Sequence, residues 1–150
     1  MLAAIRPDSL NFPLLVHVLG ATVLVGGLVT AFIAQLYAWR RDEPGAVSFT
    51  RLSFWALLLA AVPGWIAMRL GGEWIYSREG WDQVDEEPAW LGVGYLTAEP
   101  GALILLISVI LAGLAMRRNS GTLARIATVL TTVLLVAYVV AIWAMTAKPT

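Results

Sequence analysis

The chain has 150 residues, of which 59% are apolar and only 13% are charged. Ten basic and ten acidic residues cancel, so no basic field favours nucleic acid as a partner. A soluble domain of this length buries too little of its surface to hide so many apolar residues, whereas a bilayer accepts them. The absence of cysteine excludes disulfides, thiolate metal sites and a cysteine nucleophile.

Four apolar segments are long enough to cross a membrane as helices. They comprise residues 11–39, 52–70, 96–116 and 122–146. About 20 residues of helix span the hydrocarbon core, and lipid offers no other partner for backbone amides. The first segment is too long for the apolar part of a signal peptide, and we expect it to be retained. The sequence therefore predicts an all-α bundle of four transmembrane helices, forming one membrane domain over residues 1–150.

The links between the segments differ in charge, and this predicts the orientation. Six arginines lie in or beside the first and third links, namely Arg40, Arg41, Arg51, Arg117, Arg118 and Arg125. Basic links favour the cytoplasmic side, which suits a bacterial inner membrane. We expect both termini and the second link to face outward. Arg69, near the outward end of the second segment, opposes this orientation.

The second link, about residues 71–95, is predicted to be a long outward loop. Its carboxylates are Glu73, Glu79, Asp82, Asp85, Glu86 and Glu87, and its aromatic residues include Trp74, Tyr76, Trp81, Trp90 and Tyr95. Such tryptophans and tyrosines are typical of an aromatic belt at the lipid headgroups. The alternative is a folded cap over the bundle, with a short interfacial helix near residues 74–81 and a turn at Pro88.

Small residues spaced four apart predict where the helices pack, because helices in lipid associate by close backbone approach. The pairs are Gly27 and Ala31, Ala60 and Gly64, Ser108 and Ala112, and Ala137 and Ala141. Pro63 lacks an amide hydrogen and predicts a kink in the second segment. The hydroxyls of Thr128, Thr131 and Thr132 are expected to bond carbonyls of their own helix.

Ionisable groups inside a membrane are hypotheses of function by default, and this chain has few. The predicted orientation places four residues in the outer leaflet, one on each helix: His17, Met68, Glu99 and Met145. Imidazole and thioether groups suit Cu(I), and both also serve as axial ligands of haem. These four residues are therefore the predicted cofactor site, with haem b or copper as the cofactor and His17 as the metal ligand.

These residue types also have ordinary structural roles. A lone histidine often hydrogen-bonds a neighbouring helix, and methionine fills gaps between helices. Haem with two histidine ligands would need two copies of His17 in a homodimer, since the chain has one histidine. Further alternatives are a quinone whose carbonyl bonds His17, and an acid–base pair of His17 with Glu73 or Glu99. No residue is assigned a catalytic role.

The first segment resembles one known pattern. In the run HVLGATVLVGG, residues 17–27, a histidine is followed nine and ten residues later by paired glycines. This resembles the first helix of a loose group of bacterial membrane proteins, which includes CopD-type copper-resistance proteins, HemJ-type protoporphyrinogen oxidases and uncharacterised four-helix families. The resemblance covers about one helix of the four. It implies metal or haem binding at His17, with Gly26 and Gly27 as a packing pair.

Two functions follow from these observations. The first is a non-catalytic membrane subunit or accessory protein, of the kind found in respiratory or metal-handling complexes, because the spans hold so few polar groups. The alternative is a haem- or copper-binding membrane protein that uses His17. A transporter or channel is disfavoured because a single histidine offers no polar path. The expected partners are the bilayer and either further copies of the chain or a larger membrane complex.

Overall fold

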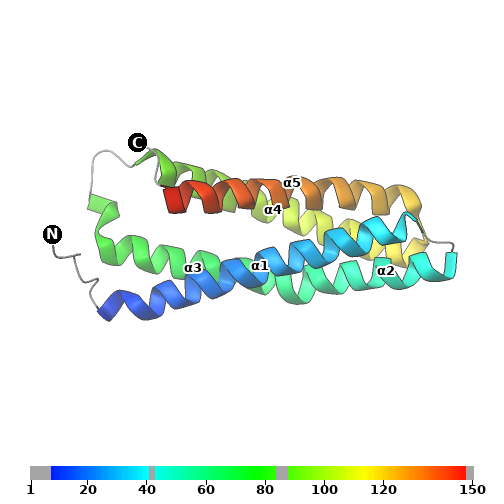
Figure 1. The fold of residues 1–150 in the computed structure, drawn as a ribbon, viewed down its shortest axis with the longest axis horizontal. Helices are drawn as coiled ribbons and strands as arrows, with labels where there is room; N and C mark the ends of the chain where they lie inside the picture. The colour runs from blue at the N-terminus through cyan, green and yellow to red at the C-terminus, as the bar shows by residue number, and fades with distance from the viewer. Residues whose placement is uncertain (1–7, 41–42, 84–87, 148–150) are drawn as a thin grey trace.

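Four long helical spans run side by side in the computed structural model, which describes residues 8–40, 43–83 and 88–147 (Figure 1). A 3-10 turn at Asp8–Leu10 leads into α1. The spans are α1 (Asn11–Ala38), a continuous helix made of α2 (Glu43–Ala56), η2 (Leu57–Ala61) and α3 (Val62–Glu79), then α4 (Ala89–Arg118) and α5 (Gly121–Ala147). All four are long and apolar enough to cross a membrane, and no strand occurs among the described residues. The predicted all-α four-helix bundle is confirmed.

The outer surface of the bundle is apolar along its length. Leu59, Leu70, Leu96 and Val136, for example, are more than half exposed although they lie in the spans. Water-soluble proteins rarely expose so much contiguous apolar surface, and lipid is the medium that accepts it. The bundle is therefore that of a membrane-spanning protein.

The connection between α3 and α4 is shorter than the predicted link. Helix α3 continues to Glu79, where Gly80 ends it with a left-handed φ of 73°, and α4 already begins at Ala89. The predicted separate helix near residues 74–81 is mostly the end of α3, followed by a 3-10 turn at Trp81–Gln83. Both helices thus carry polar residues beyond their apolar stretches. Asp85, Glu86 and Glu87 lie outside the described residues.

Helices α1 and α3 pack with their backbones almost in contact. A Cβ atom added at Gly71 would lie 2.5 Å from the backbone nitrogen of His17, and Cβ atoms at Gly20 or Gly64 would also overlap backbone of the facing helix. At Gly27, an added Cβ would lie 2.7 Å from a backbone nitrogen of η2. Real side chains do not make such contacts, so glycine is required at all of these positions.

The predicted small-residue pairs lie mostly at helix contacts. Gly27, Ala31, Ser108 and Ala112 are all buried. Gly26 is the exception, because it is exposed and an added Cβ would have no neighbour within 4 Å. It therefore packs against no other helix of the described chain, since successive residues on a helix point about 100° apart. Gly27 alone of that pair faces another helix.

Among the described residues, the second span contains one π-helical turn, at Leu57–Ala61, which ends two residues before Pro63. Proline lacks an amide hydrogen, and its ring crowds the carbonyl four residues earlier, which belongs to Leu59. A wider turn accommodates both effects without ending the helix. The span predicted to kink at Pro63 therefore carries a π turn ahead of the proline and continues as a helix.

Several polar side chains inside the spans find partners close by, although Oε1 of Gln35 and the hydroxyl of Tyr138 are buried without a hydrogen-bond partner in the described part of the chain. The hydroxyls of Thr128, Thr131 and Thr132 each donate to the carbonyl four residues earlier at 2.8 Å, as predicted. Gln35 of α1 donates from its side-chain amide to Ser53 of α2 at 2.8 Å, and both side chains are buried. This second contact ties α1 to α2 at the opposite end of the bundle from His17.

The α1–α3 contact predicts a matched pair of glycine variants. Gly64→Ala should lower the free energy of unfolding by about 1–3 kcal/mol, because the new Cβ forces the two helices apart. Gly26→Ala, on the exposed face of α1, should not lower the free energy of unfolding measurably, because its Cβ would have no neighbour within 4 Å. Unfolding in mild detergent, followed by circular dichroism, measures both. Equal stability of the two variants would contradict the backbone contact.

Candidate functional site

A cavity of about 680 Å³ lies between the helices at the end of the bundle where α3 leads to α4. At this end the pair α1 and α3 separates from the pair α4 and α5 (Figure 1). We call it the α3–α4 cavity. All four helices line it, with side chains that include His17 of α1, Met68 and Tyr76 of α3, Tyr95 of α4 and Met145 of α5. Its walls are mainly aliphatic and aromatic.

The cavity opens sideways between α1 and α5. On α1 its lining includes Val18 and Thr22, and on α5 it includes Ile142 and Thr146. All four of these residues are exposed on the surface that would contact lipid. A molecule dissolved in the bilayer could therefore reach the cavity between these two helices without passing through water.

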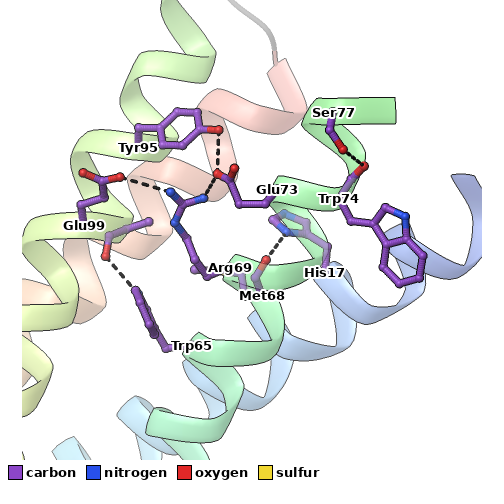
Figure 2. Close-up of polar contacts among 10 residues, drawn as sticks. His17, Trp65, Met68, Arg69, Glu73, Trp74, Ser77, Tyr95 and Glu99 are labelled. Atoms are coloured by element: carbon purple, nitrogen blue, oxygen red, sulfur yellow. Dashed lines mark hydrogen bonds and ion pairs between the residues drawn. The ribbon is translucent and has the colours of Figure 1, made fainter. Parts of the chain in front are cut away.

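The opposite side, between α3 and α4, is closed by a polar network around Arg69 (Figure 2). Arg69 pairs with Glu73 one turn along α3, and its Nη2 atom lies 3.1 Å from Oε1 of Glu99 on α4. The Tyr95 hydroxyl donates to Oε1 of Glu73 at 2.9 Å, and the guanidinium lies 4.8 Å from the centre of the Tyr95 ring. Two carboxylates thus compensate the one arginine that opposed the predicted orientation.

Aromatic pairs extend this closure toward the end of the bundle. Tyr76 and Tyr95 meet edge to face, with ring centres 5.8 Å apart. Trp81 and Trp90 do the same at 5.9 Å, and the indole of Trp81 donates to Glu79 at 2.9 Å. Such edge-to-face pairs add to the energy of area burial. They join the end of α3 to the start of α4 beside the cavity, which Trp81 and Trp90 line.

His17 lies in the close contact between α1 and α3, opposite Gly71. Its Nδ1 atom is 2.8 Å from the carbonyl oxygen of Met68 (Figure 2). A carbonyl oxygen can only accept, so Nδ1 carries the proton and donates it. In a neutral imidazole Nε2 then keeps its lone pair as an acceptor. No hydrogen bond to Nε2 is made within the described ranges, and His17 lines the cavity.

The structure brings together three of the four predicted site residues. His17, Met68 and Met145 line the same cavity, although Met68 is largely buried in the core between the helices. Glu99 is exposed and absent from the lining, because its carboxylate is engaged by Arg69. In this structure Glu99 therefore belongs to the polar network around Arg69 and not to the lining of the cavity.

The described residues contain no group of three histidine, aspartate or glutamate side chains able to hold a metal ion. A metal in the cavity would depend on His17 and methionine sulfur. Neither Glu73 nor Glu99 hydrogen-bonds His17 in the described part of the chain, because both carboxylates face Arg69. The acid–base pair considered for an enzyme is therefore not formed in this conformation.

Sequence reasoning missed the role of Arg69. One signal was available, since Arg69 and Glu73 are four residues apart and share a helix face. That signal was lost because residues 71–95 were assigned to a loop. The pairing of Arg69 with Glu99 had no local signal, because it joins residues on two helices.

Comparison of the chain with protein-family models, curated proteins and solved structures finds no match in any of the three. The fold and the apolar surface therefore show only the structural class of the protein, a membrane-spanning four-helix bundle. The resemblance of the first helix to CopD- and HemJ-type proteins stays a prediction.

The polar network predicts a coupling between α3 and α4. In a double-mutant cycle, Arg69→Gln and Glu99→Gln should show a coupling energy of about 0.5–1 kcal/mol toward stability, because the pair is partly exposed. The coupling should decrease as salt is raised. Unfolding in detergent at two salt concentrations measures it. Arg78→Gln, an exposed arginine further along α3, is the control and should show no coupling to Glu99.

Proposed function

We propose that this chain is a non-catalytic integral membrane protein, an accessory protein or subunit, that holds an apolar ligand in the α3–α4 cavity. The observation that carries the proposal is the cavity of about 680 Å³ between the four helices. Ligand sites are typically concave and mainly apolar, with a few polar groups that orient the ligand. His17, Arg69 and Tyr95 are such groups here.

The sideways opening supports a ligand that arrives from the bilayer. The cavity's lining on α1 and α5 includes residues of the lipid-facing surface, so an apolar molecule would remain in an apolar medium throughout its entry. Among the described residues, the lining holds one imidazole (His17), one guanidinium (Arg69) and one carboxylate (Glu79), and this scarcity supports binding rather than chemistry. The carboxylates of Glu73 and Glu99 are already paired with Arg69.

We further propose a location in a bacterial inner membrane with both termini outward, which would put the cavity in the outer leaflet. The basic residues at the α4–α5 connection, Arg117 and Arg118, support this orientation. An accessory role also implies assembly with copies of the chain or with a larger membrane complex, of the respiratory or metal-handling kind. The uncovered opening between α1 and α5 leaves room for a partner helix there.

The binding proposal predicts a bound molecule that depends on the cavity. Protein extracted from its membrane into nanodiscs should carry an apolar small molecule detectable by native mass spectrometry. Ala21→Phe should remove it, because Ala21 lines the cavity and the ring would fill the space. Val23→Phe is the matched control, since Val23 is exposed and lies outside the cavity lining. Equal ligand loads in the two variants would contradict the proposal.

A specific observation favours the second candidate, binding of haem b or copper through His17. Histidines that ligate metals usually donate their other ring nitrogen to a carbonyl or carboxylate, which fixes the ring and its tautomer. The bond from Nδ1 of His17 to the Met68 carbonyl is of this kind. His17 fits as one ligand through Nε2, and methionine sulfur would have to complete the site.

The second candidate predicts a spectroscopic signature. Protein produced with supplied haem should show a Soret band, or copper should bind in a one-to-one ratio, and His17→Ala should abolish either. Met116→Ala is the control, because Met116 lines a separate cavity at the other end of the bundle. A colourless and metal-free preparation from haem- and copper-supplied cells would rule this candidate out.

A further inference from the structure

We propose that the ligand of the α3–α4 cavity is a neutral amphiphile whose head donates a hydroxyl hydrogen bond to Nε2 of His17. Long-chain alcohols, phenols and hydroquinones have such heads. This inference rests on the proposed function, because it assumes that the cavity holds an apolar ligand. It adds the chemistry of the polar head, which the cavity's size and opening do not determine.

The first step is the fixed orientation of the imidazole ring. Nδ1 is held at 2.8 Å by the Met68 carbonyl. A Cβ atom added at Gly72 would lie 3.2 Å from Nδ1 and 3.3 Å from Cε1, so this edge of the ring rests against α3. Nε2 therefore lies toward the edge of the ring that points away from the Met68 carbonyl. Glycine at position 72 leaves the ring space to adopt this position.

The second step is the direction of the hydrogen bond that Nε2 can make. Because the only proton of the neutral ring is donated to Met68, Nε2 can accept but not donate. A ligand head with acceptors alone, such as an ether, an ester or a quinone carbonyl, would place two lone pairs face to face. Leaving such groups unpaired in an apolar site costs free energy. The quinone carbonyl considered from the sequence is therefore disfavoured as a partner of Nε2, whereas the hydroxyl of the corresponding hydroquinone fits.

The third step is the charge around the cavity. Among the described residues, Arg69 is the only arginine or lysine in the lining, and it is already paired with Glu73 and Glu99. Glu79 adds a further carboxylate to the lining. An anionic head, such as a fatty acid carboxylate or a phosphate, would therefore meet Arg69 with its charge already compensated by two carboxylates. Like charges at short range repel strongly where water is scarce, so a neutral head is favoured.

A pair of probes that differ in one hydrogen-bond donor tests the inference. The probes are 4-dodecylphenol and its methyl ether, 4-dodecylanisole, which share the chain and the ring. The protein is placed in nanodiscs of phosphatidylcholine, and the two dissociation constants are measured by native mass spectrometry. The phenol should bind about two- to twelvefold more tightly, which is the range expected for one hydrogen bond.

Two substitutions assign the preference to Nε2. His17→Asn keeps an amide N–H near the position of Nδ1, able to bond the Met68 carbonyl, but places no acceptor near Nε2. His17→Gln can place its amide oxygen near that position. The preference for the phenol should disappear in His17→Asn and return in part in His17→Gln.

The outcomes separate this inference from the proposed function. Binding of both probes with equal affinity to the unaltered protein would overturn the hydroxyl-donor inference and leave apolar ligand binding intact. A phenol preference that persists in His17→Asn would overturn the role of His17. Binding of neither probe, together with equal ligand loads in Ala21→Phe and Val23→Phe, would overturn the inference and the proposed function together.

Discussion

The backbone contact between α1 and α3 determines the geometry of the whole α3–α4 end of the bundle. Packed helices ordinarily lie about 8–10 Å apart because side chains separate them. At Gly20, Gly64 and Gly71 there is no room for even one Cβ atom. In lipid, where the hydrophobic effect does not draw helices together, this close van der Waals contact is a main source of association. It also brings a short side chain, His17, within reach of a carbonyl on the neighbouring helix.

The α3–α4 cavity exists because α3 lies against α1 and is separated from α4. Helix α3 packs against α1 on one side and faces α4 on the other. Near the cavity, α3 and α4 contact each other through charged and aromatic side chains rather than through close-packed aliphatic ones. Arg69 spans the separation with a long side chain whose charge is compensated from both helices. The network closes one flank and leaves the flank between α1 and α5 open. The close contact of α1 with α3 and the separation of α3 from α4, which Arg69 spans, thus define the site.

Much of the fold could be predicted from the sequence, because hydropathy and helix length are local properties. The ends of α3 and α4 could not, since hydropathy falls at the first carboxylates while the helices continue to Glu79 and from Ala89. Gly20 and Gly27 are seven residues apart, as are Gly64 and Gly71, but a search for four-residue spacing overlooks this pattern. For the site, the grouping of His17, Met68 and Met145 followed from depth in the membrane. The hydrogen-bond partner of His17 could not be predicted, because it is a backbone carbonyl and every residue type has one.

Because of the π turn at Leu57–Ala61, the packing of α3 on α1 depends on the number of residues in this stretch more than on their type. A π turn holds one residue more than an α turn, so everything after it is rotated by about 100° relative to an unbroken α-helix. Gly64, Met68 and Gly71 all follow this turn and reach α1 only because of that rotation. Exchange of one aliphatic residue for another in this stretch would leave the register unchanged. Deletion of a single residue would turn the glycines toward lipid, so relatives of this protein should keep the residue number of this stretch, while residue type can vary at its exposed position Leu59.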